Sequence, residues 1–471
     1  MSLWSAQEAA LATGGETAGD WQAEGVSIDT RTLQAGDLFV ALADQRDGHD
    51  FVAEALQKGA SAALVSRRPA DVLSDENLLY VKDVQAALEG LARAARQRSA
   101  AQVIAITGSA GKTSTKEMLR VMLQAQGKTH ASYASYNNHW GVPLTLASLP
   151  RDAAFAVVEI GMSNSGEIAP LARLVRPDAA LITAVAPAHL AACENLEGIA
   201  REKAAIVQGL TAQGYAVVNA EAPCRSVMEQ AVAAKGCQSL WFGTGAAQAR
   251  IAQLSVKDGL TQVMASIGDL SLKFELHTVG RHFAMNALGA LALLSKLNAD
   301  VEKAARVLAQ WQPAEGRGMR HQLHASFGAF ELIDDAYNAN PVSMQAALDV
   351  LAQATSSRRV AFLGDMKELG ADERAHHSAL ARLPAIKNVD LIHTAGPLMA
   401  ALHRSLPVEK RGQHFANAKE MAACVEDLLQ ADDCILVKAS LSSGLRQVVD
   451  AIKIISQFEP DCAARPVERK R

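Results

Sequence analysis

The sequence predicts an α/β protein built from three domains, and three observations support this prediction. The chain has 471 residues, and at roughly 150 residues per domain this length allows about three domains. Short apolar runs alternate with helical patterns along most of the chain, as in parallel sheets covered by helices. Finally, 49% of the residues are hydrophobic and 20% are charged, which is enough apolar material for several ordinary cores. This composition excludes a disordered chain, a collagen-like fibre and a coiled coil.

Charge and cysteine usage limit the partners and the location. The chain has 46 basic and 50 acidic residues, and its sequence shows no basic excess or stripe. We therefore expect no nucleic-acid partner. No apolar run is long enough to cross a bilayer, and the first residues do not form a secretory signal, so we expect no membrane insertion. Six scattered cysteines without a CxxC pair are typical of reduced thiols. We therefore expect a cytoplasmic protein.

Residues 1–100 form the first predicted domain, a small α/β unit. Its predicted strands are short apolar runs, and a long Ala/Leu/Arg helix closes it. The strands are predicted at 38–42, 61–66 and 78–81, and the helices at 51–60 and 84–98.

Residues 101–313 form the second predicted domain, with a parallel sheet. It opens with the continuous apolar run 103–106, as expected for a strand buried on both faces. The polar and apolar residues of 248–280 alternate around glycines, which predicts antiparallel hairpins attached to this domain. Further strands are predicted at 154–160, 179–185 and 215–220, and helices at 167–175, 197–210 and 284–297.

Residues 314–471 form the third predicted domain. The segments FELIDDA, RRVAFLGD, DLIHTAG and CILVKAS each join an apolar strand to a loop, with helical patterns between them. This alternation predicts a Rossmann-like α/β domain.

A glycine-rich loop between a buried strand and a helix is the strongest motif. Its glycines allow the backbone N–H groups to surround an anion, the lysine reaches the terminal phosphates, and the hydroxyl after it can hold Mg²⁺. Ile106 stands where the full Walker A spacing has glycine, so the match is to a shortened loop. The pattern predicts ATP or GTP binding. The predicted phosphate-binding residues are Gly108, Ser109, Ala110, Gly111, Lys112, Thr113 and Ser114.

Three residues further along the chain are candidates for metal chemistry. Glu159 ends the next predicted strand, where a second strand supplies a carboxylate to Mg²⁺ in phosphoryl-transfer sites. His189 lies in the loop APAHL, and most lone loop histidines are surface residues. Lys203 has the pattern of a surface lysine on an amphipathic helix, so the residues alone would not select it.

These residues, in this order, resemble the Mur ligase family, the ATP-dependent amide-forming enzymes of peptidoglycan precursor synthesis. The resemblance covers nearly the whole chain, and the C-terminal motifs resemble the branch that adds D-alanyl-D-alanine. The N-terminal segment 25–42 is similar to that branch's nucleotide-sugar domain. The motifs are TGSAGKTSTKEM at 107–118, YNNHWGVPLTL at 136–146, VVEIGMSNSGEIAPL at 157–171, LITAVAPAHL at 181–190, GRHFAMNALGALAL at 280–293, EGRGMR at 315–320, DDAYNANPVSMQAAL at 334–348 and LGDMKELG at 363–370.

The resemblance implies a role for each matching residue. ATP would phosphorylate the carboxylate of UDP-MurNAc-tripeptide, and D-Ala-D-Ala would attack the acyl phosphate. Thr113 and Glu159 would hold one Mg²⁺, and His189 and Lys203 a second, with Lys203 carbamylated by CO₂. Lys112, His189 and Lys203 are the implied catalytic residues. Asn286 would meet the adenine, and Arg317 and Asp335 the phosphate and ribose. The implied UDP-sugar contacts are Thr30, Arg31, Asn137, Asn138 and Gly141.

Several positions depart from the family pattern. Ala184 and Ala191 stand where Asn and Glu are more usual, and residues 438–441 read Lys-Ala-Ser-Leu where Lys-Gly-Ser-Arg is usual. Alanine restricts φ, and the lost arginine removes a possible anion contact. The contributions of Lys438 and Ser440 therefore stay open, as does the identity of the third residue of the acceptor peptide.

Three alternatives remain beside this interpretation. The ligase that adds a diamino acid would carry a DNPR motif, which is absent from the sequence. Folylpolyglutamate synthase would lack the nucleotide-sugar domain. A P-loop nucleotide switch has no evident need for Glu159, His189 and Lys203 together. We expect a monomer.

Overall fold

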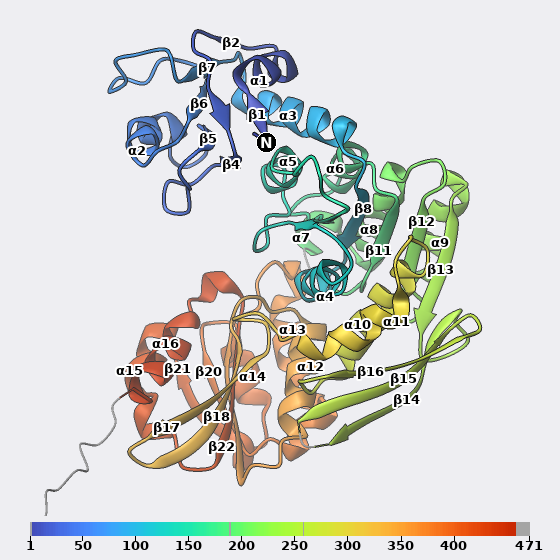
Figure 1. The fold of residues 1–471 in the computed structure, drawn as a ribbon. Coiled ribbons are helices and arrows are strands. Elements are labelled where there is room, and N and C mark those ends of the chain that lie inside the picture. The colour runs from blue at the N-terminus through green and yellow to red at the C-terminus, as the bar shows by residue number, and fades with distance from the viewer. Residues whose placement is uncertain (1, 188–189, 258, 458–471) are drawn as a thin grey trace, which may run out of the picture.

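Three mixed sheets follow one another along the chain in the computed structural model, which describes residues 2–187, 190–257 and 259–457. Figure 1 shows the three units, with the first at the top, the second at the centre and right, and the third at the lower left. The predicted three-domain α/β architecture is therefore confirmed. The domain limits near residues 100 and 313 stay predictions.

The N-terminal domain contains a five-stranded sheet in the order β2-β7-β6-β5-β4. Its strands are parallel except for β2. Asp83 caps the long helix α3 by accepting a hydrogen bond from the backbone N–H of Ala86, which satisfies a free donor at the helix start. The elements are α1 Ala6–Thr13, α2 Val52–Gln57, α3 Val84–Arg98, β1 Trp4–Ser5, β2 Glu16–Thr17, β3 Gln22–Ala23, β4 Gly25–Ser27, β5 Asp37–Val40, β6 Ala62–Val65 and β7 Leu78–Tyr80.

Helix α3 belongs to two apolar clusters at once. Its residues Leu88 and Leu91 pack with Trp4 and with Ala147 of the central domain, and Ala92 packs in a central-domain cluster. The Trp4 indole N–H also donates to the carbonyl of Ala147, at 2.9 Å. The N-terminal and central domains therefore share apolar core as well as a buried hydrogen bond.

The central domain contains a nine-stranded sheet in the order β16-β15-β14-β13-β12-β11-β8-β10-β9. On β8, Ile104 and Ile106 pack into one core cluster, and Val103 and Ala105 into another, so this strand is buried on both faces as predicted. The elements are β8 Gln102–Thr107, β9 Thr129–Ala131, β10 Phe155–Glu159, β11 Ala179–Ile182, β12 Tyr215–Asn219, β13 Gln238–Gly243, α4 Lys112–Gln124, α5 Gly141–Ala147, α6 Ile168–Val175, α7 Leu190–Cys193, α8 Leu196–Ala204 and α9 Arg225–Lys235.

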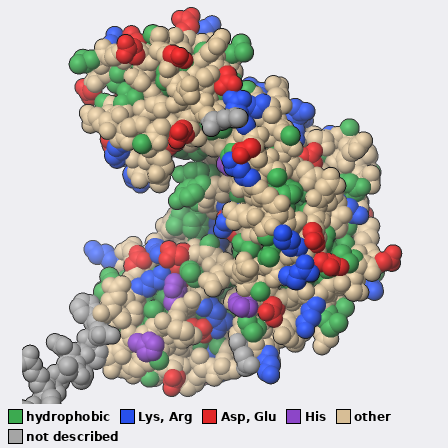
Figure 2. Space-filling model, viewed as in Figure 1, with side chains coloured by type: hydrophobic (Ala, Val, Ile, Leu, Met, Phe, Trp, Pro, Cys, Tyr) green, Lys and Arg blue, Asp and Glu red, His purple; other side chains and the backbone are tan. Residues whose placement is uncertain are grey.

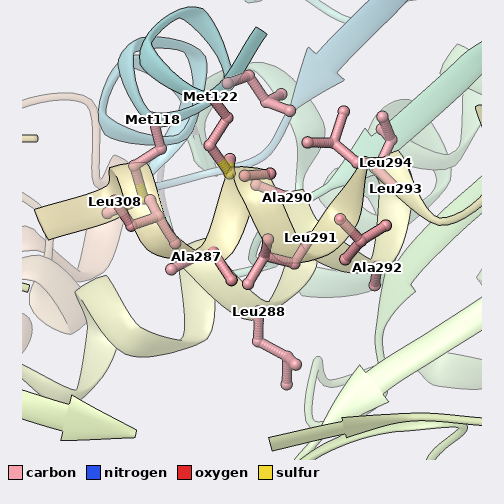
Figure 3. Close-up of a cluster of buried hydrophobic side chains, with 14 of the residues drawn as sticks. Met118, Met122, Ala287, Leu288, Ala290, Leu291, Ala292, Leu293, Leu294 and Leu308 are labelled. Carbon is pink, nitrogen blue, oxygen red and sulfur yellow. The ribbon is translucent and has the colours of Figure 1, made fainter. Parts of the chain in front are cut away.

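The predicted hairpin segment is β14 Ala249–Lys257, β15 Leu260–Ile267 and β16 Leu270–Leu276, whose strands are antiparallel to one another. The segment joins the central sheet through a parallel pairing of β14 with β13. Helices α10 (Arg281–Leu294) and α11 (Val301–Val307) follow. Helix α10 is apolar almost all round: Met118 and Met122 of α4 lie on one side of it, and Leu288 points away toward the hairpin strands (Figure 3). Such a helix is stable only when it is enclosed on every side.

The C-terminal domain contains a six-stranded sheet in the order β17-β18-β22-β19-β20-β21, parallel except for β17. Apolar clusters lie on both faces of it. The elements are β17 Met319–Ala325, β18 Gly328–Asp335, β19 Arg358–Gly364, β20 Leu391–Ala395, β21 Arg411–Phe415, β22 Asp433–Lys438, α12 Pro341–Ala352, α13 Glu373–Ala379, α14 Met399–Ser405, α15 Ala418–Cys424 and α16 Arg446–Ile455.

One predicted helix differs from the structure. The pattern at 197–210 predicts a single helix, but α8 ends at Ala204 and the chain continues in 3₁₀ turns over Ala205–Gly209. Gly209 packs directly against α6, where an added Cβ would lie 2.1 Å from the carbonyl oxygen of Ala172. This long-range contact is not visible in the sequence pattern. Among the described helices, none is long and apolar enough to cross a membrane.

Candidate active site

The loop Gly108–Gly111 joins β8 to α4 in a conformation that requires glycine at both ends. Gly108 has φ of 150° and Gly111 has φ of 82°, values that side chains with a Cβ rarely adopt. A Cβ at Gly108 would lie 2.0 Å from the Thr183 hydroxyl, and one at Gly111 would lie 2.7 Å from the side-chain oxygen of Asn286. The loop is therefore shaped by its neighbours as well as by its own sequence.

Lys112 begins α4 and folds back over the loop. Its ammonium donates a hydrogen bond to the carbonyl of Gly108 at 2.7 Å. Burial lowers the pKa of Lys112, with the charge of Arg317 adding to the fall and Glu159 opposing it. The lysine thus lies over the loop, close to a carboxylate and to a cation from the C-terminal domain.

A buried polar cluster lies beside the loop. The Thr113 hydroxyl donates to one oxygen of Glu159 at 2.9 Å, and the Asn137 amide donates to the other at 2.6 Å. Glu159 is fully buried at the end of β10. A hydroxyl next to a carboxylate is the kind of oxygen pair that Mg²⁺ takes together with phosphate oxygens. In the described part of the chain, no group of three or more His, Cys, Asp or Glu could alone hold a metal ion.

Lys203 is fully buried near the end of α8, although the sequence suggested a surface position. Within the described residues its ammonium nitrogen has no hydrogen-bond partner. Burial lowers the pKa of Lys203 to about 7, and the charge of Lys112 adds to the fall while Glu202 opposes it. A neutral amine is the form that reacts with CO₂, so this environment suits a carbamate. The predicted ligand His189 lies outside the described residues.

The carboxylate of Glu202 is already engaged next to Lys203. Its two oxygens accept from the backbone N–H groups of Gly166 and Ile168, each at 2.8 Å. These donors lie at the start of α6, where the helix leaves N–H groups free. Glu202 therefore holds α6 against α8 and gives Lys203 no hydrogen bond.

The C-terminal domain contributes Arg317 and Asp335. The Arg317 guanidinium lies over the Tyr337 ring at 4.2 Å and donates to the Ser135 hydroxyl at 2.8 Å. Burial raises the pKa of Asp335, and the buried Lys438 opposes the rise by donating to the Asp335 carboxylate at 2.7 Å. Lys438, whose contribution the sequence left open, therefore orients a predicted site residue.

Part of the phosphate loop, Glu159 and Arg317 line one cavity of about 980 Å³ between the central and C-terminal domains. It brings together most of the predicted nucleotide-binding residues. The predicted site residues Gly108, Thr113 and Lys203 are not part of its lining. On the face shown in Figure 2, the surface is hollowed between the upper and lower parts of the molecule. The predicted site residues that line the cavity are Ser109, Ala110, Gly111, Lys112, Ser114, Asn137, Glu159, Asn286, Arg317 and Asp335.

The remaining predicted substrate contacts lie outside this lining. Arg31 is exposed, and its guanidinium donates to both carboxylate oxygens of Asp29. The carbonyl of the buried Thr30 accepts from Lys58 at 3.0 Å. The side-chain oxygen of Asn138 accepts from the backbone N–H of Gly141 at 2.9 Å. A Cβ at Gly141 would collide with the backbone of Tyr136. Asn138 and Gly141 thus have structural reasons for their identity beside any role in binding.

Sequence reasoning missed two contacts that join the domains. Asn340 caps α12 and also donates from its side chain to the carbonyl of Ser109, at 3.2 Å. Ser135 accepts from Arg317, as described above. The Asn-Pro pair at 340–341 signals a helix start, but neither partner could be found without the fold.

A phosphate loop, a buried carboxylate beside it and a cavity completed by a second domain define a nucleotide-dependent P-loop enzyme. Three family models match the chain: "Mur ligase family, catalytic domain" at residues 22–97, "Mur ligase middle domain" at 106–294 and "Mur ligase, glutamate ligase domain" at 319–441. The chain belongs to the Mur ligase family.

Relatives and solved structures extend this similarity over nearly the whole chain. The UDP-N-acetylmuramoyl-tripeptide–D-alanyl-D-alanine ligase of Escherichia coli (strain K12) is 36% identical, covering 91% of this chain and 94% of the relative. The Rickettsia prowazekii (strain Madrid E) protein of the same name is 30% identical, covering 95% and 99%. A crystal structure of MurF from Acinetobacter baumannii superposes with a TM-score of 0.83 at 29% identity, covering 97% of this chain and 99% of that one.

Proposed function

We propose that this protein is an ATP-dependent ligase that joins D-alanyl-D-alanine to UDP-MurNAc-tripeptide, giving ADP, phosphate and the pentapeptide precursor of peptidoglycan. The observation that carries the proposal is the cavity between the central and C-terminal domains, where the phosphate loop, Glu159 and Arg317 meet. Relatives bearing this name align over nearly the whole chain, which supports the choice of substrates. The binding of ATP, metal and acceptor would depend on the predicted site residues, which are taken in turn below.

The phosphate loop and Lys112 would hold the β- and γ-phosphates of ATP, with Gly108, Ser109, Ala110, Gly111, Thr113 and Ser114 completing the loop. Phosphoryl transfer needs charge neutralisation and alignment more than covalent help. Lys112 and Arg317 approach from different domains, so both charges would meet the transferred group only when the domains are together. Asn286, against Gly111, would face the adenine, and Asp335 the ribose.

Magnesium would neutralise phosphate charge at this site. Thr113 and Glu159 would hold one ion, and a carbamylated Lys203 with His189 a second. The fit for the first ion rests on a hydroxyl and a buried carboxylate 2.9 Å apart. The fit for the carbamate rests on a buried amine whose pKa is about 7, since an ammonium could neither react with CO₂ nor bind a cation.

The UDP-sugar end of the acceptor would lie between the N-terminal domain and the loop after β9. Thr30 and Arg31 would contribute from the first domain, and Asn137, Asn138 and Gly141 from the second. The charges of Asp29 and Arg31 both act on the pKa of Tyr136, which is raised mainly by burial. Tyr136 of the second loop thus lies within electrostatic range of Asp29 and Arg31 in the first domain. The domain limits 1–100, 101–313 and 314–471, a monomeric state and a cytoplasmic location belong to the same proposal.

Ligation can be distinguished from a nucleotide switch by phosphate release. We expect purified protein to release phosphate from Mg·ATP only when UDP-MurNAc-tripeptide and D-Ala-D-Ala are both present. Lys112→Ala should lower this rate by at least about a hundredfold, because the loop loses the charge that faces the phosphates. Phosphate release that ignores both co-substrates would contradict the ligase. Release with UDP-MurNAc-dipeptide and a free diamino acid, in place of the tripeptide and D-Ala-D-Ala, would favour the other branch of the family.

A further inference from the structure

The loop 132–140, between β9 and α5, is held by a buried lysine of the phosphate-loop helix. Lys116 lies on α4 and is fully buried. Its ammonium donates to the carbonyls of Ser132 at 2.7 Å and Ala134 at 2.5 Å, and pairs with Glu117 at 3.0 Å. We call the segment 132–140 the junction loop. A buried ammonium is costly unless it is fully bonded, so these bonds fix the backbone of the junction loop against α4.

The backbone of the junction loop is also strained at the residue before Ser135. Ala134 has φ of 45°, in the left-handed region that residues with a Cβ avoid. Such a conformation persists only where surrounding bonds over-determine it, and it is found often at functional sites. Lys116 supplies one of those bonds directly, through the carbonyl of Ala134. Lys116 therefore fixes the backbone directly before Ser135, which helps to set the position of the Ser135 hydroxyl.

The Ser135 hydroxyl lies in a chain of hydrogen bonds that runs between two domains. Thr113 donates its single hydroxyl proton to Glu159 at 2.9 Å. At the 3.2 Å contact between the Thr113 and Ser135 hydroxyls, Ser135 must therefore be the donor. Ser135 in turn accepts from Arg317 of the C-terminal domain at 2.8 Å. The chain thus leads from a guanidinium to a carboxylate through two hydroxyls, with every donor pointing the same way.

Each end of this chain belongs to the proposed phosphate site. Thr113 and Glu159 flank the phosphate loop, Arg317 comes from the C-terminal domain, and Ser135 itself lines the cavity. The Arg317 guanidinium lies over the Tyr337 ring and donates to the Ser135 hydroxyl, so it has a contact on each of these two sides. A simple surface turn would not need a hydroxyl at this position, nor a buried lysine to hold it.

We propose that Ser135 is a positioning residue that aligns Arg317 with the phosphate loop, and that Lys116 holds the junction loop in the position this requires. The inference rests on the proposed ligase function. In it, Ser135 acts through Arg317, whose charge is needed while the phosphoryl group is transferred. Removing the hydroxyl should leave the loop and Lys112 able to bind ATP but misdirect the guanidinium in the transition state.

The test is steady-state ligation by full-length Ser135→Ala, with Ser135→Thr as the variant that keeps the hydroxyl. We expect Ser135→Ala to lower kcat by about tenfold with KM for ATP changed by less than about twofold, the pattern of an interaction made in the transition state. Ser135→Thr should stay within about threefold of the wild type. Tyr133→Phe, an exposed neighbour on the same loop, is the matched control and should be unchanged.

A double-variant cycle separates positioning from general damage. If Ser135 acts through Arg317, adding Ser135→Ala to Arg317→Lys should lower kcat by less than about twofold further. The reason is that the effects of substitutions at two contacting residues are not additive. The same should hold on adding it to Lys116→Met. Arg120→Met, which also removes an ion pair to Glu117 but does not touch the junction loop, controls for the change on α4.

The outcomes are separable. A wild-type enzyme without ligation would refute the proposed function. If the wild type ligates, any of three results would overturn the positioning role. The first is an unchanged kcat in Ser135→Ala, and the second is a Ser135→Thr variant as slow as Ser135→Ala. The third is double variants whose losses in kcat are the full product of the single losses. The Ser135 variants alter a half-buried side chain, so they decide the question even where Lys116→Met does not fold.

Discussion

Replacing Lys203 with methionine should remove the activity of the protein. It should also make the protein more stable than a wild type whose Lys203 carries no carbamate. Lys203 is fully buried and, within the described residues, its amine has no hydrogen-bond partner. Methionine keeps an unbranched stem of similar length without the charge. The wild-type protein must hold Lys203 either as a costly buried ammonium or as a neutral amine, and the variant avoids this cost.

The size of the effect and its dependence on pH follow from the pKa of Lys203. This pKa falls from 10.5 to about 7 on folding. The unfolded chain therefore binds more protons between these values, so wild-type stability rises with pH across this window. At about 1.36 kcal/mol per pKa unit, unmodified Lys203 costs up to about 5 kcal/mol near pH 6 and about 2 kcal/mol near pH 9. The advantage of Lys203→Met should shrink by about 2.5 kcal/mol over this range.

Urea unfolding at the two pH values, in CO₂-free buffer with a chelator and no nucleotide, measures this difference. The pH-dependent part is the sharper quantity, because differences in packing between lysine and methionine cancel from it. Lys303→Met, at an exposed position on α11, is the control for the substitution itself. A stability difference between wild type and Lys203→Met that is equal at both pH values, or that grows with pH, would refute the reasoning.

At two other positions, substitution should lower the stability of the protein, whereas Lys203→Met should raise it. Asn340→Ala should lower the free energy of unfolding by about 2 kcal/mol, about 1 from the lost helix cap and about 1 from the bond to Ser109. Asp300 is an exposed cap whose side chain accepts from the backbone N–H of Lys303 at the start of its own helix. Asp300→Ala should therefore lose about 1 kcal/mol, and equal losses for the two variants in urea unfolding would argue against the contact between domains. Glu202→Gln should cost about 1–3 kcal/mol, because the amide places an N–H against one of two backbone donors. Glu197→Gln on the same helix is the control, because the ion pair of Glu197 with Arg201 is exposed and contributes little to stability. Thermal unfolding should show little change for this control. A Glu202→Gln variant that is as stable as Glu197→Gln would contradict the prediction.

Local chemistry explains which parts of the fold and site could be predicted. The strand 103–106 and the loop after it follow from neighbouring residues, and Gly108, Gly111 and Lys112 have local reasons for their identity. The alternating pattern at 248–280 likewise predicts the hairpins β14–β16, because period-two alternation is a property of one segment. Asn286 and Arg317 were reached through resemblance to a family, since no local pattern marks them.

The rest depends on contacts between distant segments. Lys203 has the spacing of a surface lysine, and it is the packing of α8 against neighbouring elements that buries it. Lys116 has the same surface-like composition around it, yet its amine bonds to carbonyls on a loop that begins 16 residues further on. Ser135 could not be selected, because its partners Thr113 and Arg317 lie 22 and 182 residues away.

The shared core around α3 has a consequence for how the chain can fold. Trp4, Leu88 and Leu91 pack with Ala147 in one cluster, while Ala92 of the same helix packs into the central domain. A fragment ending after α3 would lack the surface that covers this apolar face, so it would expose the indole of Trp4 and leave its N–H without the carbonyl of Ala147. We therefore expect the first cooperative folding unit of this chain to extend beyond its first sheet and to include α5. During synthesis, the N-terminal domain can complete its core only after α5 has emerged.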